Sequence, residues 1–410
     1  MKGLALKLRV LQINAVPYGS TGGIMFSLAD VLEAKGDCVL CTTGFSWRKC
    51  ERSDYFMTSN ILEKTIHTYL ARITGRIGCF SYLATLNMIR KIREFNPDII
   101  HLHNLHGWFV NIPMLFKYIK ETNTPVIWTF HDCWPFTGHC PHFTMINCDK
   151  WKTGCYDCPQ HLSYPKSYFD CSKSMYSKKA IWFSDVKNLT IVTPSQWLSN
   201  LVKLSFLKDY SVKVINNGID LNIFHPIKSD FRKNNELEEK HIVLGVAYAW
   251  DNRKGLDVFI ELSKRLDNNY KIVLVGTDDE ADKLLPKNII SIHRTKNQKE
   301  LAEIYSAADV FVNPTREDNY PTVNMEALAC GTPVVTYKTG GSGEIPDEKC
   351  GTVVPYNDSE ALISEVKRVC LQKPYSEKAC LERAKSFDMN NCFQEYEQLY
   401  RCVYERVTKS

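Results

Sequence analysis

One stretch constrains the fold of this chain more than any other: residues 310–336, VFVNPTREDNYPTVNMEALACGTPVVT. Its first three residues are apolar and predict a buried parallel strand, which a polar loop follows. Residues 323–330 then predict a short helix that ends at Gly331 and Pro333, before a second apolar strand begins. A doubly wound α/β sheet binds its ligand at such a strand, loop and helix start. We therefore predict an α/β fold with a ligand site at this loop.

Acidic side chains give this predicted site its chemistry. Glu317 and Asp318 lie in the loop, and Glu326 lies in the helix. Their carboxylates can accept hydrogen bonds from sugar hydroxyls, and the backbone N–H groups at the helix start can hold a phosphate. The alternative is that these acids are solvated surface residues.

The block resembles the acidic pair motif of the retaining glycosyltransferases of family four, which have the GT-B fold. In that family one acid contacts the donor sugar, and a second acid eight positions later contacts the nucleotide ribose. The matching residues here are Asp318 and Glu326. The family usually has Glu at the first position, so Glu317 is the alternative contact to the sugar.

The resemblance also implies a domain organisation, and a length of 410 residues is ample for it. We expect two Rossmann-like domains facing a central cleft, with a C-terminal helix crossing back to the first domain. The expected boundaries are 1–225 for the acceptor-binding domain, with a Cys-rich insertion at 133–160, and 240–385 for the nucleotide-sugar-binding domain. Residues 386–410 are the returning helix.

Two cations precede a predicted helix at 257–266. Arg253 and Lys254 beside a helix N-terminus favour binding of a diphosphate. In the resembled family an Arg and a Lys there bind the donor diphosphate. Lys254 matches directly, whereas Tyr248 stands where the Arg usually lies, so Arg253 is the substitute. Arg294 is expected to flank the base.

A glycine-containing segment follows the first predicted strand, residues 9–16. Gly22 and Gly23 lie between this strand and a helix that ends near Gly36, which is an anion-binding arrangement. A merely tight turn is the alternative. In the resembled family this loop lies near the acceptor and the donor phosphates.

Histidines follow the next two predicted strands. His101, His103 and His106 lie at the end of one strand, with metal binding as one interpretation and a polar acceptor-site wall as the favoured one. His131 follows the strand at 126–130, and a residue at a strand's carboxyl end faces the ligand crevice. In the family the matching histidine lies near the donor sugar and the acceptor. A buried structural imidazole is the alternative.

The insertion contains four cysteines, Cys140, Cys148, Cys155 and Cys158, with seven, six and two residues between them. The closing C-x-x-C favours a structural zinc site, with a redox-active pair or free thiols as alternatives. Possible substitute ligands are Cys133, His139 and His142. The insertion resembles a subgroup active in exopolysaccharide assembly of the colanic-acid type. The family typically needs no metal for catalysis.

Charge and hydropathy bear on the partners. A formal net charge of +5 does not by itself indicate nucleic acid. No apolar run reaches the ~18 residues of a membrane span. The first residues predict a strand rather than a signal peptide, so we expect a cytoplasmic protein, at the inner face of the membrane if it contacts lipid. Residues 61–95 are a basic amphipathic segment, for which a solvated helix face is the favoured interpretation and contact with a membrane or a lipid-linked acceptor is the alternative.

Together with these patterns, the resemblance implies a hexosyltransferase that moves a sugar, with retention, from a UDP- or GDP-sugar to a lipid-linked saccharide in surface polysaccharide biosynthesis. His131, Asp318 and Glu317 are its predicted catalytic residues. Two alternatives remain: a non-catalytic nucleotide-sugar-binding subunit of a polysaccharide assembly complex, and a GT-B nucleotide-sugar epimerase.

Overall fold

The computed structural model describes residues 7–48 and 50–409, and these form two compact units. The first unit comprises Met1–Phe143, Asn147–Ile215 and Phe393–Ser410, and the second comprises Thr144–Ile146 and Asn216–Cys392. The chain therefore changes unit at Ile215, and the polar run before residue 240 groups with the second unit. Arg232 in this run donates to Asp309 at 2.6 Å.

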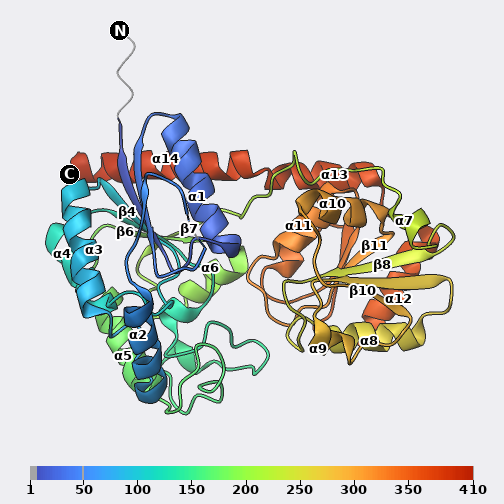
Figure 1. The fold of residues 1–410 in the computed structure, drawn as a ribbon, viewed down its shortest axis with the longest axis horizontal. Helices are drawn as coiled ribbons and strands as arrows, with labels where there is room; N and C mark the ends of the chain where they lie inside the picture. Colours follow the sequence, from blue (N-terminus) through green and yellow to red (C-terminus); the bar gives the residue numbers. More distant parts are fainter. Residues whose placement is uncertain (1–6, 49, 410) are drawn as a thin grey trace, which may run out of the picture. The chain divides into compact units, whose positions relative to one another are not determined.

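The first unit is built on a seven-stranded parallel sheet (Figure 1). Its strand order is β3-β2-β1-β4-β5-β6-β7. The strands are β1 (Arg9–Asn14), β2 (Cys38–Thr43), β3 (Tyr55–Met57), β4 (Ile99–Leu102), β5 (Val126–Thr129), β6 (Leu189–Thr193) and β7 (Ser211–Val214). Residues 1–6, at the start of the predicted N-terminal strand, lie outside the described residues.

Helices connect most of these strands, as crossovers between parallel strands usually do. They are α1 (Gly19–Ala34), α2 (Ile61–Thr74), α3 (Tyr82–Phe95), α4 (Ile112–Thr122), α5 (Ser172–Phe183) and α6 (Gln196–Val202), with short 3₁₀ turns at Trp134–Phe136 and Lys150–Lys152. Strands β4, β5 and β6 are buried along their whole length, which matches the continuous apolar runs expected of a sheet covered on both faces.

The second unit is built on a six-stranded parallel sheet of order β10-β9-β8-β11-β12-β13. Its strands are β8 (His241–Val246), β9 (Tyr270–Val275), β10 (Ile289–Ile292), β11 (Val310–Asn313), β12 (Val334–Tyr337) and β13 (Gly351–Val354). Its helices are α7 (Phe231–Asn234), α8 (Leu256–Arg265), α9 (Asp279–Asp282), α10 (Gln298–Ala307), α11 (Thr322–Ala329), α12 (Ser359–Gln372) and α13 (Glu377–Ala384), with 3₁₀ turns at Ser342–Glu344 and Lys385–Phe387.

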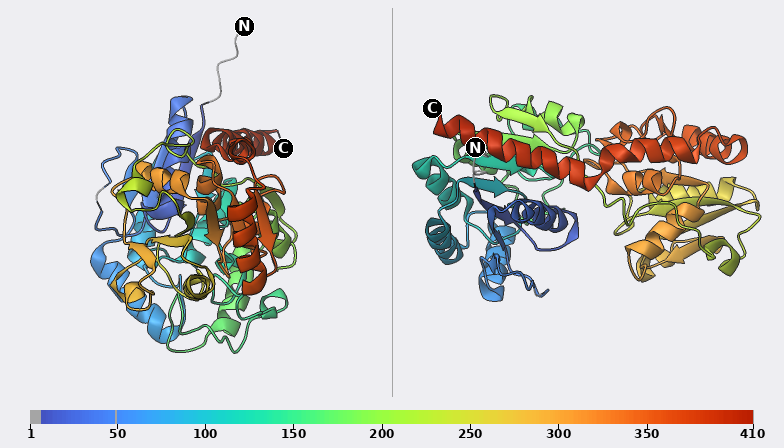
Figure 2. Two further views of the ribbon diagram at one scale, coloured as in Figure 1. Left: turned by 90° about the vertical axis from the view of Figure 1, so that its right-hand side faces the viewer. Right: turned by 90° about the horizontal axis from the view of Figure 1, so that it is seen from above.

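The chain ends in helix α14 (Met389–Thr408), which lies along the first unit from Phe393 onward (Figure 2). Tyr400 contacts His101 of β4, and Arg401 pairs with Asp37 at 2.5 Å. The predicted α/β fold with two parallel sheets and a returning C-terminal helix is confirmed. Among the described residues, no helix combines the length and the apolar character needed to cross a bilayer.

Candidate functional site

The second sheet has its topological switch point between β8 and β11. From β8 the chain adds β9 and β10 on one side, whereas from β11 it adds β12 and β13 on the other. Open α/β sheets bind ligands at the carboxyl ends of the strands beside such a switch point, which here is where the loops after β8 and β11 begin. Arg253 and Lys254 lie in the first loop, and Glu317 and Asp318 in the second.

Two glycines let these loops approach their neighbours closely. Gly255 has φ +80°, and a Cβ there would lie 2.6 Å from the Pro314 carbonyl oxygen. Gly340 has φ +51°, and its Cβ would lie 1.7 Å from the Asp318 carbonyl oxygen. Any other residue would add a clash to an unfavourable backbone conformation at both positions. The β8 and β11 loops are also joined by the Arg316 N–H, which donates to the Arg253 carbonyl at 2.8 Å.

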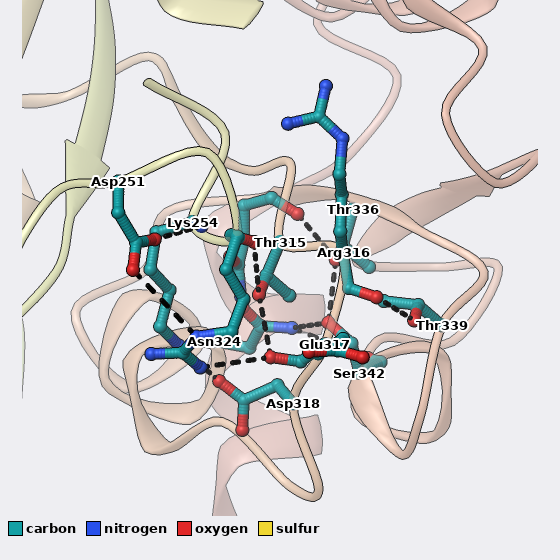
Figure 3. A network of polar contacts seen from close by, with 12 residues as sticks. Asp251, Lys254, Thr315, Arg316, Glu317, Asp318, Asn324, Thr336, Thr339 and Ser342 are labelled. Atoms are coloured by element: carbon teal, nitrogen blue, oxygen red, sulfur yellow. Dashed lines mark hydrogen bonds and ion pairs between the residues drawn. The ribbon is translucent and has the colours of Figure 1, made fainter. Parts of the chain in front are cut away.

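An ion pair joins the two loops at the switch point. Lys254 Nζ lies 2.5 Å from Asp318 Oδ2, and both side chains are about one-fifth exposed (Figure 3). Arg253 Nη1 donates to the Glu317 carbonyl at 3.3 Å. Both predicted diphosphate cations therefore contact the loop that contains the two predicted sugar-binding acids.

Beneath the loop, buried polar groups hold the strand ends. Asn324 of α11 accepts from Asn313 at 2.7 Å and donates to Ser342 Oγ at 3.1 Å. Ser342 Oγ also contacts Thr336 Oγ1 at 2.7 Å. Arg316 extends away from this network and pairs with Asp257 through two hydrogen bonds of 2.8 and 2.7 Å. Each of these buried polar side chains has a hydrogen-bond partner, so the network holds the strand ends below the loop that contains Asp318.

Glu326 lies one turn into α11, and Tyr305 of α10 positions its carboxylate. The Tyr305 hydroxyl donates to Glu326 Oε2 at 3.0 Å, and the Tyr305 ring is fully buried. Burial raises the pKa of Glu326, and the hydrogen bonds from Tyr305 and Thr322 partly oppose this shift. Glu326 is thus held in one orientation as a hydrogen-bonding group.

Tyr248 and Arg294 meet at the same edge of the sheet. Tyr248 follows β8 and is 86% exposed, and the Arg294 guanidinium carbon lies 5.9 Å from the centre of its ring. Arg294 follows β10, so its side chain reaches past the end of β9 toward the switch point. Next to it, His293 pairs with Asp282 at 2.7 Å, which raises the pKa of His293.

In the first unit the two predicted loop glycines lie inside helix α1 rather than before it. Gly22 is buried, and a Cβ there would lie 2.6 Å from the Pro17 backbone. Gly23 is exposed and has open space around it. The helix therefore starts earlier than predicted because Gly22 allows its first turn to pack on the preceding segment.

A chain of hydrogen bonds orients His131. Gln12 Nε2 donates to the Met25 carbonyl, so Gln12 Oε1 faces His103 Nε2, 3.1 Å away, and accepts a hydrogen bond from the His103 Nε2–H. Burial holds His103 neutral, because it lowers the pKa of His103 well below its usual range. His103 Nδ1 must then accept from His131 Nε2, at 3.1 Å. These partners assign the Nε2–H tautomer to His131 and leave its Nδ1 as an acceptor.

Two further histidines at this edge make separate contacts. His101 bonds Tyr400 of α14 at 2.5 Å and Thr129 at 2.8 Å. His106 pairs with Asp132 at 2.9 Å. Burial alone would raise the pKa of Asp132, but His106 and the Trp134 N–H outweigh it and hold the pKa at about 2. These contacts favour the polar wall over a metal site for the three histidines.

The four cysteines of the insertion are only partly gathered. A hydrogen bond with Cys140 lowers the pKa of the Cys158 thiol. Cys155 Sγ accepts from the Gly138 N–H at 3.1 Å. Within residues 7–48 and 50–409, the one group of three or more candidate ligand atoms lying within 4.8 Å of one another is the exposed set Asp279, Asp282 and His293. Structural zinc at the cysteines stays a prediction, and zinc analysis of freshly purified, reduced protein checks it.

Two residues of these networks were missed by sequence reasoning. Gln12 orients His103. The only indication of this role in the sequence is that Gln12 is polar within the otherwise mostly apolar strand RVLQIN. Tyr305 orients Glu326 from a different helix, α10. In the sequence, Tyr305 stands at helical spacing from the other buried residues of α10 and so looks like an ordinary core residue. Such contacts join residues far apart in the chain, so no local pattern reveals them.

Comparison with known families agrees with this architecture. The model of the Glycosyltransferase Family 4 domain matches residues 25–223, and the model of Glycosyl transferases group 1 matches residues 227–387. Between them they account for nearly the whole chain. The chain belongs to the GT-B glycosyltransferases of group 1. The switch point at β8 and β11 lies within the part matched by the group 1 model.

Two curated relatives of this glycosyltransferase are informative. WcaC of Escherichia coli K12, named for colanic acid biosynthesis, is 26% identical over 271 residues. That alignment covers 64% of this chain and 65% of WcaC, just under two thirds of the relative's length. The N,N'-diacetylbacillosaminyl-diphospho-undecaprenol alpha-1,3-N-acetylgalactosaminyltransferase of Campylobacter jejuni is 29% identical over 49% of this chain and 57% of its own.

Solved structures share the fold over nearly the full length. Sucrose-phosphate synthase from Thermosynechococcus elongatus superposes with a TM-score of 0.72 at 18% identity, covering 98% of this chain and 100% of that one. HepE from Anabaena, in complex with UDP, gives 0.65 at 15% identity over 97% and 100%. These similarities concern the fold alone.

Proposed function

We propose that this glycosyltransferase moves a hexose from a nucleotide-diphosphate sugar to a lipid-linked saccharide, with retention of the anomeric configuration, in surface polysaccharide biosynthesis. The observation that carries the proposal is the Lys254–Asp318 ion pair at the switch point of the second sheet. Lys254 and Asp318 lie 2.5 Å apart, and a neighbouring cation and acid at one sheet edge suit the adjacent phosphate and sugar groups of a single ligand, which supports the proposal.

Each residue of the site has a proposed role. Lys254 and Arg253 stabilise the charge that develops on the leaving diphosphate. Glu326 holds the ribose, Asp318 or Glu317 holds the sugar hydroxyls, and Arg294 flanks the base. In the transfer, the bond from the anomeric carbon to the diphosphate oxygen breaks while the acceptor oxygen bonds on the same face. The acceptor's proton passes to the leaving diphosphate.

The donor and acceptor classes draw support from relatives. HepE was solved with UDP, and the Campylobacter enzyme is named for a diphospho-undecaprenol acceptor. WcaC supports a place in exopolysaccharide assembly. In the first unit, the neutral, hydrogen-bonded His103 and His131 give the sheet edge a polar character that suits contact with hydroxyl groups.

Donor-dependent thermal stabilisation tests the proposal. The folded protein is mixed with UDP-, GDP- and ADP-sugars, and a ligand that binds only the folded state raises the melting temperature by mass action. A selective shift identifies the base and justifies an acceptor search. No shift with any donor would contradict the proposed site.

A second candidate is a non-catalytic sugar-nucleotide-binding subunit. Tyr248, in the position where the resembled family has an arginine, favours it. Donor binding without turnover, across a panel of lipid-linked acceptors, distinguishes this candidate from the enzyme. Product analysis distinguishes a nucleotide-sugar epimerase, which changes the donor without an acceptor.

A further inference from the structure

The loop after β2 in the first unit contains an unusually exposed tryptophan. The chain has eight tryptophans, all of them within the described residues, and Trp47 alone among them is exposed. Its exposed fraction is 81%. Tryptophan buries a large apolar surface when a partner covers it, and it is enriched at binding surfaces for that reason. Trp47 is therefore a candidate contact for a ligand.

Neighbouring groups hold the loop around Trp47 in one conformation. The Phe45 N–H donates to Ser59 Oγ at 3.2 Å, and Lys64 Nζ donates to the Phe45 carbonyl at 3.3 Å. The rings of Phe45 and Trp47 meet edge to face, with their centres 4.9 Å apart. Because the Trp47 ring is already supported on one side, a ligand that covers it has little side-chain freedom to remove.

The loop after β1 adds another aromatic ring. The Gly44 N–H, at the start of the β2 loop, donates to the Ala15 carbonyl at 3.1 Å and so joins the two loops. The Arg48 guanidinium carbon lies 4.8 Å from the centre of the Tyr18 ring, and Tyr18 is 39% exposed. We call the following residues the aromatic shelf: Tyr18, Phe45 and Trp47.

The loop after β4 contributes an unpaired amide. The Asn104 N–H donates to Asn14 Oδ1 at 3.2 Å, which holds the start of this loop against the end of β1. The Asn104 side chain is partly exposed, and within the part of the chain that the structure describes its amide has no hydrogen-bond partner. An amide group offers two N–H donors and a carbonyl acceptor. Asn104 can therefore bond a hydroxyl group of a ligand.

Strand order brings the three loops to one edge. Strands β2, β1 and β4 are neighbours in the first sheet, and its switch point lies between β1 and β4. The neutral pair of His103 and His131 lies at the same edge. Exposed aromatic rings beside uncharged hydrogen-bonding groups suit a saccharide. The C–H groups on one face of a pyranose pack against the negative face of an aromatic ring, and its hydroxyl groups bond to amides.

The size of the shelf argues against a protein partner. A stable protein interface buries roughly 800 Å² on each side, or about 20–30 residues. The aromatic shelf presents two exposed rings, Tyr18 and Trp47, which is an area suited to a single sugar ring.

We propose that the aromatic shelf and Asn104 bind the saccharide acceptor. A pyranose ring of the acceptor stacks on Trp47, and the Asn104 amide bonds a hydroxyl group of the same saccharide. This inference rests on the proposed glycosyl transfer and extends it, because it assigns acceptor recognition to uncharged residues of the first unit that have no part in donor binding.

Saturation-transfer NMR of the full chain tests the proposal, with the methyl β-glycosides of glucose, galactose and N-acetylglucosamine as probes. Irradiating the aromatic protons of the wild-type protein should transfer saturation to the ring C–H protons of at least one glycoside. Sorbitol, an acyclic polyol without a ring face, should receive little. Trp47→Ala should raise the dissociation constant of that glycoside about thirtyfold, and Trp47→Phe should raise it less. Asn104→Ala should raise it about fivefold.

Tyr69→Ala is the matched control, because Tyr69 is 64% exposed on α2 and lies outside the aromatic shelf. This variant should bind the glycoside as the wild type does. Absence of transfer to all three glycosides in the wild type would overturn the proposal, as would equal binding by the wild type and Trp47→Ala. A concentration-dependent dimer that Trp47→Ala abolishes would also overturn it, since the shelf would then bind a second copy.

Donor-induced thermal stabilisation of the same variants keeps this test separate from the donor site. Trp47→Ala should be stabilised by the donor as much as the wild type is, because Trp47 lies in the first unit. Loss of glycoside binding with donor stabilisation intact supports the aromatic shelf. Absence of donor stabilisation in every variant would instead contradict the proposed function.

Discussion

The two units have the same order of parallel strands, but the side chains at the carboxyl ends of their strands differ in charge. At the carboxyl ends of the first sheet, Gln12, His103 and His131 form a neutral hydrogen-bonded chain. At the same edge of the second sheet, Lys254 and Asp318 are charged and partly exposed. Burial accounts for the difference, because it disfavours the charged form of an imidazole, whereas solvent and a partner maintain the ion pair. The strand order of a doubly wound sheet thus determines where a site lies, and a few side chains at that place determine the charge of the site.

The contrast suits two kinds of ligand. A diphosphate needs cations, and these are most effective where water does not fully screen them. A hydroxyl group needs an oriented acceptor, which a neutral imidazole of fixed tautomer provides. Each of the following experiments changes either the charged residues of the second unit or the neutral residues of the first.

The largest effect is expected from Lys254→Ala. Removing one group that stabilises developing charge typically lowers the rate ~10²–10³-fold, so kcat/KM with the donor chosen by thermal shift should fall by that order. Lys264 is an exposed lysine on α8 of the same unit and provides the control. Lys264→Ala should change kcat/KM very little. A Lys254→Ala loss smaller than about tenfold would remove Lys254 from the diphosphate site.

Acid should unfold the first unit before the second. Burial lowers the pKa of His67 and His101 to about 3 and of His131 and His139 to about 4, and all four lie in the first unit. In the unfolded chain these groups bind protons below about pH 6.5, whereas the folded unit excludes them. Stability is therefore retained above about pH 6.5 and lost as pH falls toward 4, by up to ~1.4 kcal/mol per pH unit for each histidine.

Hydrogen exchange at a series of pH values, corrected for intrinsic rates, resolves the two units. Peptides from β4 and β5 should lose protection between pH 6.5 and 4, while peptides from β8 and β11 retain it. In the second unit His293 is exposed and Asp282 raises its pKa, so it contributes in the opposite direction. Equal loss of protection in both units would show that these histidines do not determine acid stability.

Sequence reasoning found the second unit's site more readily than the first unit's network. The block around β11 and α11 has local signals: an apolar run, a polar loop and a helix ended by Gly331, which has φ +84°. The predicted helix over 323–330 agrees with α11 to within one residue. Lys254 and Asp318 were both singled out, and the structure pairs them.

The first unit offered weaker signals because its contacts are distant in the chain. His103 depends on Gln12, from β1, and His101 on Tyr400, 299 residues later. Neither Gln12 nor Tyr400 belongs to a sequence motif that would predict its contact with a histidine. The predicted glycine loop was wrong because Gly22 and Gly23 belong to α1. Structural zinc at the four cysteines stays a prediction, because a spacing along the chain does not by itself determine how close the sulfurs lie.

Glu326→Ala should weaken donor binding without unfolding the second unit. A hydrogen bond to a charged group contributes about 1.5–3 kcal/mol, so the dissociation constant should rise about 10–100-fold. Isothermal titration with the donor measures the constant, and circular dichroism confirms the fold. Glu326→Gln keeps an acceptor and should lose less. Unchanged donor affinity in the alanine variant would refute the assignment of Glu326 to the ribose.

The smallest effect is expected from Gln12→Met, which acts on His131 through His103. Without the Gln12 acceptor, His103 Nε2–H would be buried and unsatisfied, so His103 should carry its proton on Nδ1 and donate to His131. His131 would then bear its proton on Nδ1 and lose the acceptor there. We expect kcat to fall about tenfold, less than the ~10²–10³ expected for Lys254→Ala, with little change in KM for the donor.

Nitrogen NMR of histidine-labelled protein reports the tautomers directly. Wild-type His131 should be protonated at Nε2 and the Gln12→Met variant at Nδ1. Thr42→Val is the matched control, because it removes a buried hydrogen bond of 2.7 Å from β2 to Thr58, the residue after β3, and leaves the histidines untouched. If Thr42→Val lowers kcat as much as Gln12→Met does, the loss reflects general destabilisation of the sheet. A reduced kcat with an altered His131 tautomer in Gln12→Met alone would establish that the neutral chain orients the imidazole.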